Sequence, residues 1–330
     1  MKTCFRTLAF GLLGGLAAVG VDGGAIAREA SKPFGPWLDE LKAEAARKGI
    51  RAKTLDAVIP TVKPIPRVIE LDRRQPEFTL TLQQYMDRVV PNSRVKKGRS
   101  KFRENATLLT EIGRKFGVQP RFIVAFWGVE TDFGRLDGGF PVISALATLA
   151  HDGRRSKFFR GELIRSLRIV DQGHIAHTNM KGSWAGAMGQ FQFMPSSFER
   201  FAVDYDGDGR RDIWRNRRDA FASAANYLSK SGWKPDQTWG REVRLPAGFD
   251  MRLAGLKVRK GIRDWQALGV RRADGTDLPT RNLQSSVVLP EKTKGRAFLA
   301  YNNYRVILRW NRSSFFAVAI GSLADRIGGS

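Results

Sequence analysis

The sequence has 330 residues, 42% of them hydrophobic, which is ordinary for a globular protein and enough to bury a sizeable core. Its only cysteine is Cys4, which lies in the predicted leader described below, so a disulfide and a thiol-based site are excluded for the mature protein. With 56 Lys and Arg against 32 Asp and Glu, the formal net charge is +24. This excess indicates an anionic partner, either nucleic acid, a membrane surface or an anionic wall polymer, although part of it can simply aid solubility.

The first 27 residues have the pattern of a secretory signal. Lys2 and Arg6 give a positive start, residues 8–21 are apolar, and residues 25–27 have the small-x-small form of a cleavage site. We predict cleavage after Ala27 and an exported, periplasmic protein without a stable membrane anchor. The alternative is a retained anchor, although the apolar stretch is short for a membrane span. Because an exported protein seldom meets DNA, we expect no nucleic acid partner.

The rest of the chain predicts one unit, residues 28–330, that is mainly α with a small β-containing lobe. Short β-prone pieces separated by Gly and Pro place this lobe at about 236–290. Residues 60–78 contain four prolines and predict an extended wrapping segment. Apolar spacing predicts helices over residues 36–59, 78–90, 101–116, 120–134, 145–150, 158–170, 196–201, 218–231, 294–310 and 314–327.

Glu130 is the most informative single residue. It follows a run that begins at Pro120 and is apolar on every side, which is typical of a buried helix, and Gly134 is placed to end that helix. A carboxyl group at the end of such a helix is poorly solvated, and this disfavours its charged form. Its pKa is therefore expected to be raised, as a general acid requires. The alternative is a Glu that reaches water at the helix end.

Three segments together resemble a known family. They are Gly128-Val129-Glu130-Thr131-Asp132-Phe133-Gly134-Arg135, the Gly- and Met-rich run from Gly182 to Phe198, and Arg309-Trp310-Asn311-Arg312-Ser313-Ser314-Phe315-Phe316-Ala317. Their order and spacing resemble the lytic murein transglycosylases of the B type, glycoside hydrolase family 103, over nearly all of the chain. The resemblance implies a lysozyme-like fold with a groove for peptidoglycan glycan strands.

The implied reaction cleaves the β-1,4 bond between N-acetylmuramic acid and N-acetylglucosamine and leaves 1,6-anhydromuramic ends. Most glycosidases use two carboxylates, whereas the family implies that Glu130 acts alone, first as acid and then as base, without a cofactor. Asp132 would point away from Glu130 on a helix, so we expect capping or surface solvation of it. A monomer is expected.

The resemblance also implies residues that contact the glycan: Ser183, Gln192, Asn311, Tyr85, Tyr227, Arg154 and Arg155. Each has a plainer alternative. The serine can be a turn former, the tyrosines can pack in the core, and the arginines can be the solvated face of a basic protein. Two departures stand out: Trp310 and Phe158 occupy places where the family often has Tyr, so each keeps a ring and loses a hydroxyl.

An acidic loop follows at residues 204–212. Asp204, Asp206, Asp208, the carbonyl of Arg210 and Asp212 occupy ligand positions of an EF-hand calcium loop. The bidentate carboxylate of position 12 is replaced by Arg215, so we expect weak calcium binding at most. Asp219 would have to reach the loop from the next helix. The alternative is a loop of Asx turns held by its own backbone.

Other functions remain in competition. A muramidase that releases the glycan with water would use the same single Glu. A non-catalytic scaffold could use the charge to sit on the wall, and a nucleic-acid-binding protein would bind in a strongly salt-dependent way. His151, His174 and His177 do not form a zinc set, since His174 and His177 are three apart without a carboxylate partner at ligand spacing.

Overall fold

The computed structural model describes residues 32–73, 80–292 and 295–329. The predicted signal, residues 1–27, lies outside the described residues. Helices dominate and the strands are short, as the sequence predicts, and the strands pair antiparallel. Among the described residues, no helix combines the length and the apolarity needed to cross a membrane.

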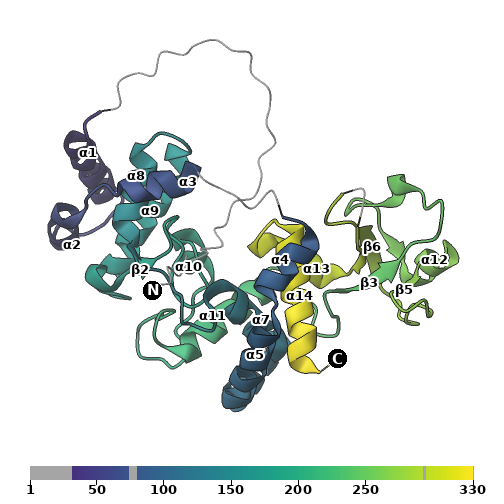
Figure 1. Ribbon diagram of the computed structural model, residues 1–330. Coiled ribbons are helices and arrows are strands. Elements are labelled where there is room, and N and C mark those ends of the chain that lie inside the picture. The colour runs from purple at the N-terminus through teal and green to yellow at the C-terminus, as the bar shows by residue number, and fades with distance from the viewer. Residues whose placement is uncertain (1–31, 74–79, 293–294, 330) are drawn as a thin grey trace, which may run out of the picture. The chain divides into compact units, whose positions relative to one another are not determined.

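The chain divides into two compact units, and α7 and α11 each run from one unit into the other. The first unit comprises residues 1–78 and 130–226. In it, α8 and α9 pack side by side, and α3 packs on α8 (Figure 1). Its elements are α1 (Phe34–Arg47), α2 (Ala52–Val58), α3 (Pro66–Arg73), β1 (Phe140–Pro141), α8 (Val142–His151), α9 (Ser156–Asp171), β2 (Lys181–Gly182), α10 (Pro195–Phe201) and most of α11 (Arg217–Lys230).

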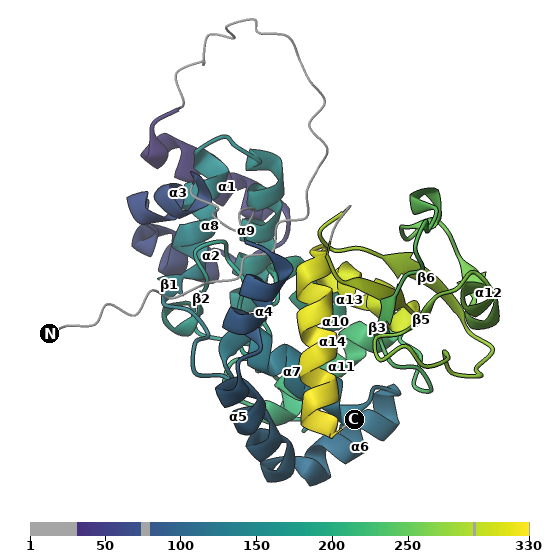
Figure 2. The ribbon, with the colours of Figure 1, turned by 45° about the vertical axis from the view of Figure 1, so that its right-hand side comes forward.

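The second unit comprises residues 79–129 and 227–330. The C-terminal helix α14 packs against α4 and α5, which Figure 2 shows beside it. Its elements are α4 (Leu82–Val89), α5 (Asn92–Glu104), α6 (Ala106–Phe116), most of α7 (Pro120–Thr131), β3 (Gly240–Arg244), β4 (Lys260–Gly261), α12 (Ile262–Ala267), β5 (Arg271–Arg272), β6 (Gln284–Val288), β7 (Ala297–Ala300), α13 (Asn302–Trp310) and α14 (Ser314–Gly328).

The five-stranded sheet has the order β4-β6-β7-β3-β5, with all neighbours antiparallel. Its core is separate and small, and it is built around Trp265 and Leu299, both fully buried. Trp265 donates its indole N–H to the Ser285 carbonyl at 3.2 Å, which satisfies the one polar atom of that ring. The lobe therefore has its own hydrophobic core.

Several secondary-structure predictions were wrong in detail. The helix predicted over 36–59 is two helices, α1 and α2, because the chain turns at Gly49, whose φ is 84°. Residues 66–73 form α3 rather than an extended segment, because Pro66 stands at the first helical position, where a proline ring is tolerated. The helix predicted over 101–116 is two helices that break at Asn105. Residues 297–300, predicted as helix, form β7, because pairing with β3 and β6 on both sides outweighs local propensity.

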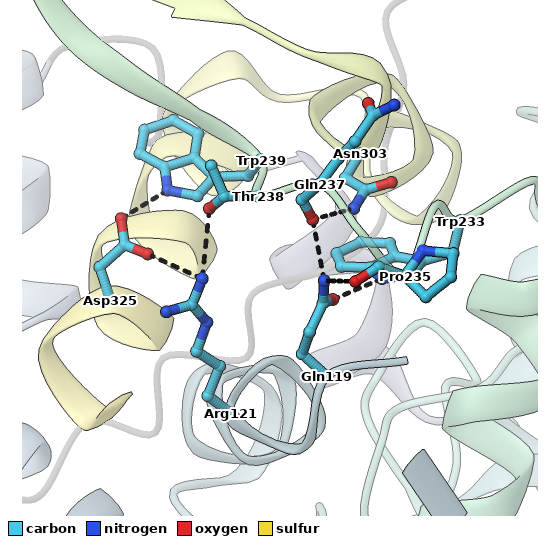
Figure 3. Close-up of polar contacts among 9 residues, drawn as sticks. All are labelled: Gln119, Arg121, Trp233, Pro235, Gln237, Thr238, Trp239, Asn303 and Asp325. Atoms are coloured by element: carbon cyan, nitrogen blue, oxygen red, sulfur yellow. Dashed lines mark hydrogen bonds and ion pairs between the residues drawn. The ribbon is translucent and has the colours of Figure 1, made fainter. Parts of the chain in front are cut away.

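The start of α7 is fastened by a polar network within the second unit (Figure 3). The Gln119 side chain accepts from the Trp233 indole at 2.7 Å and donates to the Gln237 carbonyl at 2.9 Å. Two residues on, Arg121 pairs with Asp325 at 3.7 Å, and the Trp239 indole donates to the same carboxylate at 2.8 Å. Burial raises the pKa of Asp325. The network holds the N-terminal end of the helix that carries Glu130.

Candidate active site

Glu130 lies in the last turn of α7, directly after the buried part of the helix. Trp127 and Val129 are 1% and 4% exposed, whereas Glu130 is partly exposed. The helix ends at Thr131, three residues before the predicted Gly134, because Asp132 and Phe133 already adopt the left-handed conformation with φ of 51° and 63°. Non-glycine residues seldom adopt this conformation, and such strain clusters at functional sites. Asp132 thus lies beyond the helix, where it pairs with Arg135 at 2.6 Å.

Thr131 ties the end of α7 to the Gly- and Met-rich segment. Its buried hydroxyl donates to the Gln190 carbonyl at 2.8 Å and accepts from the Gly134 N–H at 2.9 Å. Gln190 in turn donates its backbone N–H to the Ile213 carbonyl and its side-chain amide to the Trp214 carbonyl. The residue next to Glu130 is therefore connected through one glutamine to the end of the acidic loop.

Residues 182–195 form a buried, tightly turned segment. Ser183 is 3% exposed, and its Oγ accepts the Ala187 N–H at 3.0 Å, while its own N–H donates to the Ala187 carbonyl at 2.8 Å. Met188 and Phe193 exchange both backbone hydrogen bonds. The Ser183 hydroxyl is used here as an acceptor, which leaves its proton to donate.

Gln192 also has a structural task. It adopts φ of 50°, and its Nε2 donates to the carbonyls of Asp137 and Gly189 at 3.0 and 3.1 Å. These bonds hold the loop that follows α7 against the 182–195 segment. With both amide protons used, the side-chain oxygen is the atom that remains for an incoming donor.

Arg154 and Arg155 meet a carboxylate of the chain itself. Asp72 is 2% exposed, and it pairs with Arg155 and, at 3.5 Å, with Arg154. A buried carboxylate needs such partners. The Arg154 side chain is 53% exposed, so it still reaches solvent, whereas Arg155 is half as exposed and lies over the Phe159 ring. Beside them, Phe158 is 48% exposed.

The remaining predicted contacts belong to the second unit. Tyr85 is 6% exposed and packs edge-to-face on Phe315. The Tyr227 ring lies 4.5 Å from the Trp310 ring, and its hydroxyl donates to the Arg309 carbonyl at 2.8 Å. Asn311 follows the end of α13, and its Oδ1 accepts the Ser313 N–H. Tyr227 and Asn311 thus come together at the end of α13, around a buried Trp310.

The acidic loop gathers four carboxylates, whose nearest oxygens all lie within 4.8 Å of one another: Asp204, Asp206, Asp208 and Asp219. This set differs from the predicted one in a single carboxylate. Asp219 reaches the loop from α11, while Asp212 instead accepts the N–H groups of Trp214 and Arg215. Asp219 is fully buried and accepts the N–H groups of Tyr205 and Asp212, and desolvation raises its pKa.

This donor set is chemically suited to calcium, since all its members are hard oxygens. Asp219 supplies a carboxylate that position 12 lacks. Both its oxygens, however, already accept a backbone N–H, and both oxygens of Asp204 do so as well, from Gly207 and Gly209. The same carboxylates therefore bind the backbone N–H groups of the loop and are also the oxygens that a calcium ion would need.

Comparison with known proteins shows the family of the chain. A family model described as Transglycosylase SLT domain matches residues 33–325. The chain belongs to this transglycosylase family. It is 36% identical over 218 residues to the membrane-bound lytic murein transglycosylase B of Escherichia coli K12, a match that covers 64% of this chain and 58% of that protein. The chain thus spans less than two thirds of this relative.

Two solved relatives support the resemblance and the fold. SltB3 from Pseudomonas aeruginosa, solved in complex with NAG-anhNAM-pentapeptide, is 44% identical, with a TM-score of 0.87 over 90% of this chain and 80% of that one. The lytic transglycosylase Slt35 from Escherichia coli, solved with calcium, is 28% identical, with a TM-score of 0.76 over 93% and 95%. The predicted family and the mainly α, lysozyme-like fold class are confirmed.

Three residues of this transglycosylase join separate segments through side-chain contacts that the sequence does not predict: Thr131, Gln190 and Asp72. Thr131 and Gln190 stand inside the quoted motifs, yet no role was predicted for them, because only their mutual hydrogen bond reveals one. Asp72 lies in a stretch predicted to be extended, with no signal that it faces two arginines. A buried acidic residue can be suspected from sequence only when its partner is known.

Proposed function

We propose that this chain is a periplasmic lytic transglycosylase that cleaves the β-1,4 bond between N-acetylmuramic acid and N-acetylglucosamine in peptidoglycan. Family membership supports the reaction class, and the observation that carries the assignment of the acid is the position of Glu130. It is the carboxyl group at the partly exposed end of a helix that is buried over residues 122–129, beside the Thr131–Gln190 hydrogen bond.

In this proposal Glu130 performs both proton transfers. Its protonated carboxyl gives a proton to the glycosidic oxygen as the bond to the leaving sugar breaks. The resulting carboxylate then takes the proton of the 6-hydroxyl, whose oxygen attacks the anomeric carbon and closes the 1,6-anhydro ring. The acetamido group assists at the anomeric carbon, so no second carboxylate is needed.

We assign the surrounding residues by the hydrogen-bonding capacity that the fold leaves them. Ser183 retains a proton to donate to the Glu130 carboxylate or to an acetamido oxygen, whereas Gln192 retains an oxygen that accepts from a sugar N–H or O–H. Asn311 has an occupied oxygen and is left to donate through its amide nitrogen.

The other predicted contacts divide into two groups. Tyr227 is partly exposed beside Asn311 and is retained as a stacking residue, while Tyr85 is nearly buried and can offer a sugar only its edge. Arg154 is retained for substrate carboxylates because it is the more exposed of the two arginines. Arg155 is assigned to holding Asp72.

The test is digestion of purified peptidoglycan, followed by mass spectrometry of the muropeptides. Wild type should release products with anhydromuramic ends, and Glu130→Gln should release none. Asp132→Asn is the matched control, since it removes a nearby carboxylate at a position where Asn tolerates the left-handed backbone, and it should retain the products. Products heavier by one water would identify a muramidase, and no product from wild type would favour a binding scaffold.

A further inference from the structure

The β lobe carries a pocket that the proposed active site does not use. The pocket has a volume of about 370 Å³ and lies between α12 and the segment that runs from β5 to Thr280. Both views show α12 and β5 on the same lobe (Figures 1 and 2). Because all its lining residues belong to the second unit and to the lobe's own fold, the pocket is defined without reference to the rest of the chain.

The floor of the pocket is apolar and the rim is basic. Ile262 and Leu278, 2% and 4% exposed, form part of its floor and belong to the core of the lobe. Arg263, Arg271 and Gln266 supply polar groups around it. A small apolar surface surrounded by a few converging polar groups is the usual composition of a ligand site.

Arg271 is held in a fixed orientation. Its Nη1 donates to the carbonyls of Gln266 and Val270 at 2.7 and 3.0 Å, and its Nε lies 3.2 Å from a carboxylate oxygen of Asp277. The Asp277 side chain is 71% exposed, so solvent weakens this pair and an incoming carboxylate can compete for it. The contact shows that the Arg271 guanidinium can donate to a carboxylate here.

The other polar groups are also left as donors. Arg263 is exposed and has no hydrogen bond or ion pair to the described residues. The Gln266 oxygen accepts the Leu278 N–H at 2.7 Å, which leaves its amide nitrogen to donate. A rim of two guanidinium groups and an amide donor matches an anion, and planar guanidinium groups suit carboxylates in particular.

We propose that this pocket binds a free carboxylate of a peptidoglycan peptide stem, with a small side chain of the stem against Ile262 and Leu278. This rests on the proposed function, because the polymer that the chain would cleave carries short peptides with several carboxylates and methyl side chains. The pocket would thus hold the wall polymer by its peptides, separately from the groove residues that contact its sugars.

The experiment is calorimetric titration of the full chain with a free stem peptide, L-Ala-γ-D-Glu-diaminopimelate-D-Ala, at low salt. Arg263→Gln should weaken binding about tenfold, as expected for the loss of one charge-assisted hydrogen bond. Arg271→Gln should weaken it at least as much. Asp277→Asn should tighten binding, because it removes the internal competitor for Arg271.

A matched control comes from the same lobe. Arg252 is 90% exposed and pairs with Asp250 outside the pocket, so Arg252→Gln should bind the peptide as wild type does. A peptide whose carboxylates are all amidated should not bind. Equal affinities for wild type, Arg263→Gln and Asp277→Asn would overturn the proposal, as would loss of binding in Arg252→Gln to the same extent as in Arg263→Gln.

The result is separable from the test of the proposed function. The titration uses a peptide that contains no glycosidic bond, so it does not require turnover. Peptide binding that depends on Arg263, together with no anhydro products from wild type, would leave the pocket in place and remove the reaction. Anhydro products without Arg263-dependent peptide binding would do the reverse.

Discussion

The first unit contains two connected regions of opposite character, the segment 182–195 and the acidic loop 204–212. Every residue of the segment is buried, and its turns are closed by hydrogen bonds between its own backbone groups. The loop is exposed over residues 206–210, and carboxylates bind its N–H groups. Both are Gly-rich, yet the segment is shaped by close packing and the loop by local polar contacts.

The two regions differ in how they are connected to the helix that carries Glu130. The segment contacts the end of α7 directly through the Thr131–Gln190 bond, so its shape should be transmitted to the carboxyl group. Within the part of the chain that the structure describes, the loop reaches the same place through the two residues that follow it, Ile213 and Trp214, whose carbonyls Gln190 binds. Changes in the segment should therefore be severe, and changes in the loop mild.

The largest expected effect comes from glycines. A Cβ on Gly182 would lie 2.1 Å from the Ala187 carbonyl oxygen, whereas a Cβ on Gly209 of the loop would meet nothing within 4 Å. Gly182→Ala should lower the free energy of unfolding by about 3 kcal/mol or more through overpacking. Gly209→Ala should cost about 1–2 kcal/mol, because only its left-handed φ of 87° opposes a side chain.

Denaturant unfolding followed by circular dichroism measures both costs. Gly139→Ala is the control, since its Cβ would meet nothing within 4 Å and its φ is not left-handed, so it should be nearly neutral. Equal costs at Gly182 and Gly209 would mean that packing does not distinguish the segment from the loop.

The link between segment and helix is tested by Thr131→Val, which keeps the shape of the side chain and removes its hydroxyl. The buried Gln190 carbonyl and the half-buried Gly134 N–H would each lose a partner, and leaving a buried polar group without one costs about 1–3 kcal/mol. We expect kcat to fall more than tenfold with KM little changed, because Thr131 positions Glu130 rather than binding substrate. Thr131→Ser should restore the rate, and a rise in KM alone would contradict this role.

The loop should respond to calcium weakly. At millimolar affinity, 10 mM calcium adds about 1.4 kcal/mol of stability, and Tm should rise by about 2–4 °C. Asp206→Asn should abolish the rise, because it removes one of the four carboxylates of the set. Among the described residues Asp206 accepts from the Asn216 side chain alone, so the substitution leaves the loop backbone intact. Magnesium at the same concentration is the control. If calcium changed kcat severalfold while Tm rose only by this amount, the loop would control Glu130 more strongly than its contacts indicate.

The same two regions show what the sequence can predict. The Gly- and Met-rich motif located the segment, and the helix that carries Glu130 followed from an apolar run with Pro120 at its start. The EF-hand spacing located the loop and three of the four carboxylates. Local pattern is sufficient where a residue's role depends on its neighbours in the chain.

Residues whose roles depend on distant partners could not be predicted. The sequence named Asp219 only as a carboxylate that would have to reach the loop, and it is the fold of α11 that brings it there. Asp72 meets two arginines that lie about eighty positions away. Strand β7 is apolar and short, and nothing in residues 297–300 distinguishes it from the start of a helix until β3 and β6 pair with it. In each case the deciding contact is tertiary.

The smallest effect concerns the carboxylate at the end of the segment. Glu162 on α9 is 3% exposed and accepts the Ser196 N–H at 2.8 Å, and burial raises its pKa. A raised pKa in the folded state means that the folded chain holds this proton more tightly than the unfolded chain. The stability that the proton contributes is therefore present at acid pH and is lost as the pH rises through the folded pKa.

Glu162→Gln removes this dependence, because the amide is neutral at every pH and its oxygen can still accept the Ser196 N–H. The stability of the variant relative to wild type should thus increase between pH 4 and pH 7, as measured by denaturant unfolding at both values. Arg165 lowers the pKa of Glu162 and Glu199 raises it, so the change in relative stability should be small. The sign of that change distinguishes the two possibilities. A decrease would mean that the charged carboxylate itself stabilises the start of α10, and that the end of the segment is held by polar contacts, as the acidic loop is.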